Sequence, residues 1–127
     1  MSEPEEEIHQ KVWGNERWLV NTIDYCGKIL TLNKGYRCSI HYHKNKDETF
    51  YILSGIVLIE IKGKERVMKK GDVQRILPLT DHRFTGLEKS VILEVSTHHD
   101  EKDSYRKTQS EKIPEEEFKK LLKRLGI

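Results

Sequence analysis

The chain has 127 residues, of which 35% are hydrophobic and another 35% are charged. This length suits about one domain with a modest core, so we expect a single domain over residues 1–127. No run of about 18 apolar residues occurs and the first residues do not resemble a secretory signal, so we expect a cytoplasmic protein without membrane contact. The 23 basic and 21 acidic side chains nearly balance, which argues against a nucleic-acid partner.

Short strand-like runs dominate the chain from about residue 18 to residue 97, where we place the core of a barrel. Apolar or β-branched runs alternate there with turns that often contain glycine. The predicted strands are, in chain order, Trp18–Thr22, Lys28–Leu32, Tyr36–His43, Thr49–Leu53, Ile56–Ile61, Arg66–Lys69, Val73–Leu77, His82–Thr85 and Ser90–Thr97. Strands this short and this closely spaced predict an all-β sandwich or barrel rather than βαβ units.

The two ends of the chain differ from the barrel in character. Residues 1–10 are acidic and expected to fray, and residues 98–112 are polar without a clear period. Pro114, followed by three glutamates, predicts the start of a helix, and Gly126 predicts its end. One face of this helix is apolar, formed by Phe118, Leu121, Leu122 and Leu125. We expect that face to pack on the barrel or on a second subunit. Edge strands and small size further predict a homodimer.

Three histidines and a glutamate have the spacing of a metal site. Side chains alternate faces along a strand, so His41 and His43 point to the same side. The loop after them is expected to reverse the chain and bring Glu48 back on the neighbouring strand. His82 opens a later strand, which a closed barrel can bring to the same point. Three imidazoles and a carboxylate suit a divalent transition metal and leave two octahedral positions open.

These residues resemble the first cupin motif. That motif reads glycine, five residues, HxH, three or four residues, glutamate, six residues and glycine. Gly35, His41, His43, Glu48 and Gly55 match every position. The resemblance implies a cupin barrel, which is a double-stranded β-helix or jelly roll, here with a short C-terminal α-helix. It also implies one metal ion (Mn, Fe, Co, Ni or Zn) on the four predicted ligands.

The second cupin motif is matched only in part. Gly71 and His82 match, with the overall glycine-to-histidine separation intact. Pro78 is displaced by one position, Leu79 stands where an inner glycine is usual, and Gly86 replaces the final asparagine. These departures put the shape of the loop before the histidine in doubt more than the histidine itself.

Further features resemble the sugar-processing cupins, such as type II mannose-6-phosphate isomerases and D-lyxose isomerase-like proteins. These features are the stretch from Lys46 to Gly55, the run from Glu94 to Thr97 with Asp103 and Arg106 downstream, and Trp13-Gly14 with Trp18 ahead of the segment from Tyr25 to Lys28. Asp103 and Arg106 could equally serve only to pin the C-terminal tail. The resemblance implies a metal-dependent isomerase or epimerase that acts on a sugar or sugar phosphate. In such a reaction the metal stabilises an enediolate while a carboxylate moves the proton between C1 and C2. Glu94 is the candidate for that base, although it could equally be an exposed or ion-paired glutamate. Arg37 and Ser39 lie four and two residues before His41, so strand alternation places them on the same face. We therefore expect them to face the interior and bind substrate.

Two other functions stay open at this point. Three histidines and a glutamate also support dioxygen chemistry in cupins, and an Fe(II)-dependent dioxygenase predicts an apolar, aromatic pocket. A non-catalytic cupin that binds a small carbohydrate predicts affinity without turnover. Surface positions are the default expectation for four remaining charged or imidazole side chains, Lys46, Arg83, His98 and His99.

Overall fold

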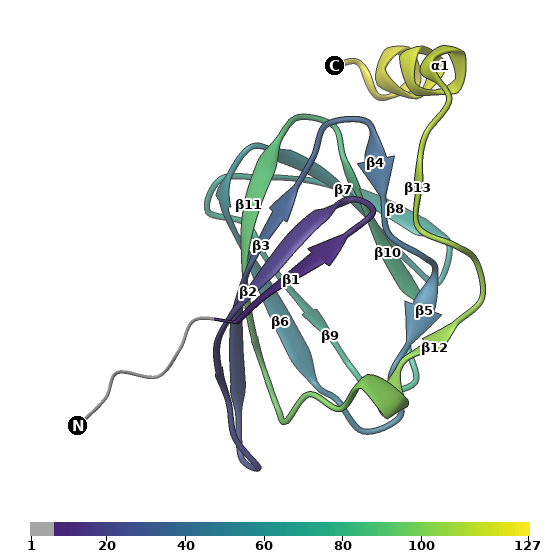
Figure 1. The fold of residues 1–127 in the computed structure, drawn as a ribbon. Coiled ribbons are helices and arrows are strands. Elements are labelled where there is room, and N and C mark those ends of the chain that lie inside the picture. The colour runs from purple at the N-terminus through teal and green to yellow at the C-terminus, as the bar shows by residue number, and fades with distance from the viewer. Residues whose placement is uncertain (1–6) are drawn as a thin grey trace.

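Two antiparallel β-sheets make up most of the molecule. The computed structural model describes residues 7–127. One sheet has the strand order β1 (Glu7–Lys11), β2 (Gly14–Asn21), β3 (Cys26–Leu32), β11 (Ser90–Ser96), β6 (Glu48–Ser54) and β9 (Val73–Ile76). The other has the order β12 (Tyr105–Arg106), β5 (His41–Tyr42), β10 (His82–Gly86), β4 (Tyr36–Arg37) and β13 (Glu111–Lys112), with β7 (Ile56–Ile61) on β10 and β8 (Lys64–Lys69) on β7. The two sheets face each other as a barrel (Figure 1), which confirms the all-β prediction.

The interior of the barrel changes from polar to apolar along its length. On the inner face of the six-stranded sheet, Ser96 pairs with Glu48, and the next inward residue, Glu94, pairs with Lys28. The row after that is apolar, because Ile92 lies between Leu30 and Ile52, and all three side chains are buried. A hydrophobic core therefore fills one end of the barrel and leaves the other end to polar side chains.

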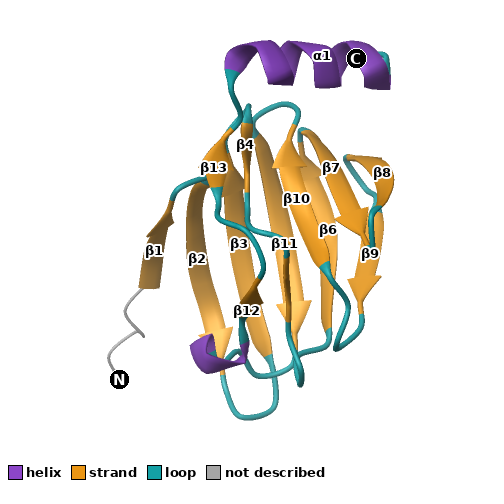
Figure 2. Cartoon of the chain, turned by 90° about the vertical axis from the view of Figure 1, so that its right-hand side faces the viewer, coloured by secondary structure: helices purple, strands orange, loops and turns teal. Residues whose placement is uncertain are grey.

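The C-terminal helix α1 (Glu115–Leu125) lies across the end of the barrel opposite the 3₁₀ helix η1 (Glu101–Asp103), as Figures 1 and 2 show. Pro114 precedes it and Gly126 ends it in the left-handed conformation (φ 72°), as predicted. Its apolar residues are half-buried rather than buried, and Phe118 approaches Gly35 in the turn before β4. Arg124 donates two hydrogen bonds of 2.9 Å to the Glu65 carboxylate. The helix is thus held on the barrel by an ion pair and a partly covered apolar face.

Three segments differ from the sequence predictions. Within the stretch expected to fray, residues 7–10 belong to β1, while residues 1–6 lie outside the described part. The polar segment 98–112 contains η1, β12 and β13 rather than irregular chain alone. The strand predicted over Tyr36–His43 is interrupted at residues 38–40, so β4 and β5 are separate. The strands within residues 98–112 and the break at residues 38–40 both arise from contacts with segments far away in the sequence, which local patterns do not report.

A close backbone contact explains the glycine that replaces the asparagine of the second motif. A Cβ atom added at Gly86 would lie 2.4 Å from the backbone oxygen of Asn33. The same turn is closed by the Gly35 amide, which donates to the Gly86 carbonyl at 2.8 Å. Any side chain at position 86 would push these two turns apart.

The outer face of the six-stranded sheet carries an apolar row. Ile29, Leu93, Tyr51 and Val73 are successive cross-strand partners, and Tyr51 and Val73 are exposed. Within the described residues no helix is long and apolar enough to cross a bilayer.

We expect the apolar row on the six-stranded sheet to lie in a homodimer interface, and light scattering should give twice the mass of one chain. Replacing Tyr51 with glutamate should then yield monomers, and a wild-type protein with the mass of one chain would contradict the prediction.

Candidate metal centre

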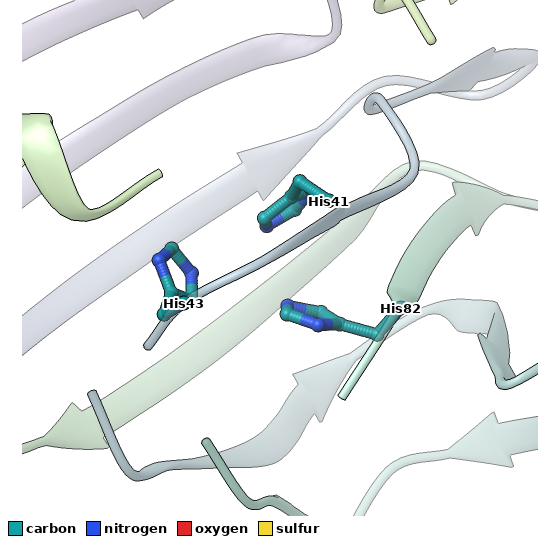
Figure 3. Close-up of side chains that lie close together, drawn as sticks. All are labelled: His41, His43 and His82. Carbon is teal, nitrogen blue, oxygen red and sulfur yellow. The ribbon is translucent and has the colours of Figure 1, made fainter. Parts of the chain in front are cut away.

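Three histidines converge at the polar end of the barrel. His41 on β5 and His82 on β10 are direct cross-strand partners, and His43 follows two residues after His41. One ring nitrogen of each lies within 4.8 Å of the others, and the rings point toward a common centre (Figure 3). The spacing of His41 and His43, together with the strand that His82 opens, was the sequence signal for this cluster. A group of three such imidazoles can hold a metal ion.

Each of the three rings is oriented by a backbone carbonyl. The Nδ1 atom of His41 lies 2.8 Å from the Ser39 oxygen, that of His43 lies 3.0 Å from the Asp103 oxygen, and that of His82 lies 2.9 Å from the Thr80 oxygen. A carbonyl only accepts, so Nδ1 donates in all three rings, and in a neutral ring Nε2 then carries the lone pair that can bind a metal. Backbone carbonyls commonly orient metal-binding histidines in this way.

Glu48 approaches the cluster from the opposite sheet. Its Oε2 atom lies 3.1 Å from His43 Nε2 and 3.6 Å from His82 Nε2. Among the described residues, Glu48 Oε2 and His82 Nε2 are buried side-chain atoms without a hydrogen-bond partner. A cation between Glu48 Oε2 and His82 Nε2 would satisfy both of these atoms, and His41 and His43 present their Nε2 atoms to the same place, so the donor set fits a metal ion.

The surroundings of His41, His82 and Glu48 keep these three groups in the protonation states that a metal needs. Burial, aided by the neighbouring His82, lowers the pKa of His41 to about 3, and burial also lowers the pKa of His82. Burial alone would raise the pKa of Glu48, but contact with His43 and the charge of Lys46 together lower it below its ordinary value. Near pH 7 the imidazoles of His41 and His82 are therefore neutral and the carboxylate is ionised.

The route by which Glu48 reaches the site differs from the prediction. We expected residues 44–47 to form a reversal that returns Glu48 on the strand next to His41. In the structure these residues cross from one sheet to the other, and Glu48 begins β6, which pairs with β9 and β11. The site is therefore built between two facing sheets rather than on one hairpin.

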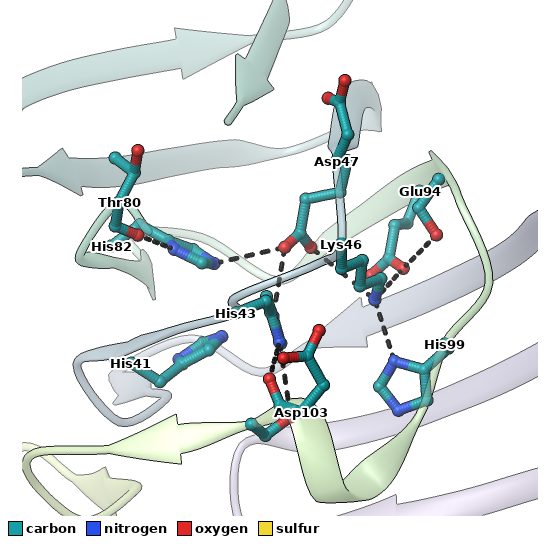
Figure 4. A network of polar contacts seen from close by, with 12 residues as sticks. His41, His43, Lys46, Asp47, Thr80, His82, Glu94, His99 and Asp103 are labelled. Atoms are coloured by element: carbon teal, nitrogen blue, oxygen red, sulfur yellow. Dashed lines mark hydrogen bonds and ion pairs between the residues drawn. The ribbon is translucent and has the colours of Figure 1, made fainter. Parts of the chain in front are cut away.

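Lys46 and His99 are buried beside the histidine cluster, so the expectation that both lie at the surface was wrong. Lys46 is 3% exposed and His99 is 8% exposed. The Lys46 ammonium lies 2.7 Å from Glu94 Oε2, 2.9 Å from His99 Nδ1 and 3.8 Å from Glu48 Oε1 (Figure 4). The contacts with Glu94 and His99 have hydrogen-bond distances, whereas the contact with Glu48 is a longer ion pair. His99 in turn lies 2.9 Å from Glu101 through Nε2.

This network keeps Lys46 charged and His99 neutral. Burial alone would lower the pKa of Lys46, but the carboxylates of Glu94 and Glu48 raise it above its ordinary value. Burial and the positive charges of Lys46 and Lys28 lower the pKa of His99 to about 4. A neutral His99 accepts from Lys46 at Nδ1 and donates to Glu101 at Nε2. Lys46 lies between strands, where alternation does not apply, so no local pattern in the sequence signals its burial.

A cavity of about 300 Å³ connects these groups to solvent. Glu94 lines it, is 4% exposed and pairs with Lys46, so it is an ion-paired glutamate, one of the alternatives that the sequence left open, and not an exposed one. Ser39 also lines it, and its hydroxyl lies 3.5 Å from His41 Nδ1. Two glutamates, Glu16 and Glu101, and two lysines, Lys11 and Lys28, add further charge to the wall.

Arg37 lies elsewhere, which corrects its predicted inward face. The interruption at residues 38–40 breaks the alternation between Arg37 and His41, so the two side chains do not share a face. Arg37 Nε donates to Glu111 at 2.8 Å, and Nη1 lies 3.5 Å from Glu117. It lines a second cavity beneath α1 together with Arg83, which lies 3.1 Å from Glu60. His98, in contrast, is exposed, as expected.

Solved structures with the same fold include proteins that handle sugars or nucleosides. Pac13, described as a nucleoside dehydratase, superposes with a TM-score of 0.72 at 15% identity, over 88% of this chain and 90% of its own. KdgF from Halomonas sp. gives a TM-score of 0.65 at 20% identity, over 69% of this chain and 81% of its own. The capsular polysaccharide assembling protein CapF from Staphylococcus aureus gives 0.71 at 20% identity, but the 83% of this chain that aligns spans only 34% of CapF.

The family is shown by the sequence itself. No curated protein matches the chain over its length. The family model described as "Cupin domain" matches residues 28–96, which is more than half of the chain and includes all four residues of the candidate metal centre. The jelly-roll topology of the two sheets agrees with this match. The chain therefore belongs to the cupin family.

Proposed function

We propose that this cupin is a metal-dependent isomerase or epimerase that acts on a sugar or sugar phosphate. The observation that carries the proposal is the position of Glu94. Its buried carboxylate lines the same cavity as His41 and His43, and one ammonium group, that of Lys46, links it to Glu48. A carboxylate beside a metal-bound substrate is what proton transfer between adjacent carbons requires.

The metal would be held by His41, His43, His82 and Glu48. A divalent transition ion (Mn, Fe, Co, Ni or Zn) on these ligands would supply positive charge that polarises the carbonyl and hydroxyl oxygens of the substrate. Ser39 lines the same wall and offers a hydroxyl for a hydrogen bond to a sugar oxygen. A cavity of about 300 Å³ is at the lower end of the range for small-molecule sites and suits a monosaccharide.

Glu94 would act as the base that removes a proton from carbon and returns it. Lys46 holds the Glu94 carboxylate at 2.7 Å, which fixes its orientation in the cavity wall. The neutral ring of His99 accepts from Lys46 on the other side, so the ammonium cannot swing away from the carboxylate without losing this bond. These three residues therefore serve proton transfer, while the four metal ligands serve substrate binding.

The polar wall of the cavity favours this function over an oxygenase. An oxygenase predicts an apolar, aromatic pocket. This cavity does contain aromatic rings (Trp13, Phe50 and Phe84) and other apolar side chains, but eight charged side chains and the hydroxyl of Ser39 also line it. CapF and Pac13 offer further support, since their names connect the fold to a polysaccharide and to a nucleoside. A cupin that only binds carbohydrate remains the second candidate, because carbohydrate binding needs the same cavity wall but does not need Glu94 to act as a base.

Isotope exchange separates an isomerase from a binding protein. Protein loaded with each candidate metal is incubated in D₂O with a panel of aldoses, ketoses and their phosphates, and NMR follows deuterium at the carbon next to the carbonyl. We expect incorporation for at least one sugar. We expect Glu94→Gln to slow it by about 10²–10⁴-fold, the usual contribution of a general base, with metal content unchanged.

A matched control for Glu94→Gln is Glu88→Gln, an exposed glutamate outside the cavity. It should exchange deuterium at the wild-type rate. Binding of a sugar without any exchange by the wild-type protein would show a binding cupin. Exchange that persists in Glu94→Gln would assign the proton transfer to another group.

A further inference from the structure

Arg106 occupies a position in the cavity that the proposed chemistry does not use. It lies on β12, a two-residue strand that pairs with β5, and its direct cross-strand partner is His41. Residues directly opposite each other in an antiparallel pair project from the same face of the sheet. Arg106 therefore projects to the side of the metal centre, and it lines the same cavity. The neighbouring pair agrees, because Tyr105 and Tyr42 stack on each other with ring centroids 5.1 Å apart.

The guanidinium of Arg106 differs from the other arginines in having no partner among the residues that the structure describes. Each of the other arginines in residues 7–127 has one: Arg17, Arg37, Arg66, Arg75, Arg83 and Arg124. For Arg106 no side-chain hydrogen bond, ion pair or ring contact occurs within this part of the chain. The group is exposed, so water rather than protein satisfies its N–H groups in the free protein.

The carboxylates of the same cavity are already engaged. Glu94 is held by Lys46, Glu16 lies 3.2 Å from the Lys28 ammonium, and Glu101 lies 2.9 Å from His99. Four basic and four acidic side chains line the cavity in the described part of the chain, so a bound divalent ion would make the net charge of the cavity positive. Lys28 and Lys46 pair with these carboxylates, and the charge of Lys11 acts on Glu16 and Glu101, which leaves the Arg106 guanidinium to meet a negative group that enters with a ligand.

We infer that Arg106 binds an anionic group of the substrate, a carboxylate or a phosphate, while the sugar oxygens face the metal centre. A guanidinium presents parallel N–H groups that match two oxygens of such a group. Because Arg106 stands beside His41 in the same cross-strand row, the anion and the reacting carbons belong to one small molecule. The substrate class is therefore an acidic sugar or a sugar phosphate rather than a neutral sugar. This inference rests on the proposed function, since it uses the same metal centre and cavity.

Equilibrium binding tests the inference without turnover. Zn-loaded full-length protein is titrated with D-galacturonate and D-mannose 6-phosphate, each beside its neutral parent sugar, and NMR follows the β12 amides and the arginine Nε–Hε signals. We expect at least one acidic probe to bind about tenfold or more tightly than its parent. Arg106→Gln should remove this advantage, and the advantage should shrink as salt is raised. The probe with the larger advantage identifies carboxylate or phosphate as the preferred anion.

Arg83→Gln is the matched control, because Arg83 is paired with Glu60 and lines the second cavity. It should keep the advantage of the acidic probe. Equal affinity of acid and parent, an advantage that survives in Arg106→Gln, or no saturable shift with either acid would overturn the inference. Binding that depends on Arg106 without deuterium exchange would leave the inference standing and reject the isomerase. Deuterium exchange on neutral sugars only would support the isomerase and reject the inference about Arg106.

Discussion

Replacing His82 with alanine is expected to abolish stable metal binding. The ring is 1% exposed, its Nδ1 is fixed by the Thr80 carbonyl, and its Nε2 faces Glu48. Loss of an outer hydrogen-bond partner of a metal ligand already costs about 10–100-fold in affinity, so loss of the ligand should cost at least about 100-fold. Elemental mass spectrometry on untagged protein, purified without added metal, should give one equivalent for the wild type and almost none for His82→Ala.

Two variants sharpen this measurement. His98→Ala removes an exposed imidazole and should retain one equivalent of metal. Glu48→Gln keeps the shape of the side chain and removes its charge, so it tests the carboxylate as the fourth ligand and should weaken binding. Circular dichroism is compared throughout, because His82 is buried and its loss must not be confused with unfolding. A folded His82→Ala protein that retains the full equivalent would exclude the proposed centre.

Replacing Lys46 with methionine is expected to cause the largest loss of stability. The ammonium is 3% exposed and lies between the carboxylates of Glu94 and Glu48. Without it, two buried negative charges would face each other with no cation between them. Removing one partner of a buried ion pair typically costs about 3–5 kcal/mol, much more than an exposed pair contributes. Urea unfolding of metal-free protein, with all variants treated alike, measures this free energy.

A double variant distinguishes charge from packing. In Lys46→Met/Glu94→Gln one of the stranded carboxylates is neutral, so part of the lost free energy of unfolding should return. Arg75→Met, which breaks an exposed ion pair with Asp47, should leave that free energy nearly unchanged. If Lys46→Met were as stable as the wild type, Lys46 would not be the charge that balances the two carboxylates, and its assigned role beside Glu94 would fail.

Much of the metal centre could be read from the sequence because its pattern is local. Alternation within a strand places His41 and His43 on one side whatever the strand pairs with, and the structure agrees. Alternation likewise places Glu94 on one face with Ile92 and Ser96, but only the structure shows that this glutamate is buried and paired with Lys46. The helix after Pro114 carries its own start and stop signals, so it too was predicted within a residue.

The prediction for Arg37 failed where alternation was extended through a break in the strand. Residues 38–40 leave β-pairing, and the Ser39 and Ile40 amides instead bond to the hydroxyls of Ser110 and Thr108. Those hydroxyls come from the C-terminal segment, about 70 residues away in the sequence. No local pattern reports such a partner, so the sequence could not show whether the side chains of Arg37 and His41 lie on the same face.

By itself, the sequence determined the strand pattern, the cupin motif and the identity of the four candidate ligands, because these depend on spacing between near neighbours. Only the tertiary structure decided that Glu48 faces the histidines from the opposite sheet and that Lys46 is buried between two carboxylates. It also decided that Arg106 stands beside His41. The physical reason is that strand pairing and burial are set by segments far apart in the chain, and the charges of Lys46 and Arg106 alone predict a solvated surface.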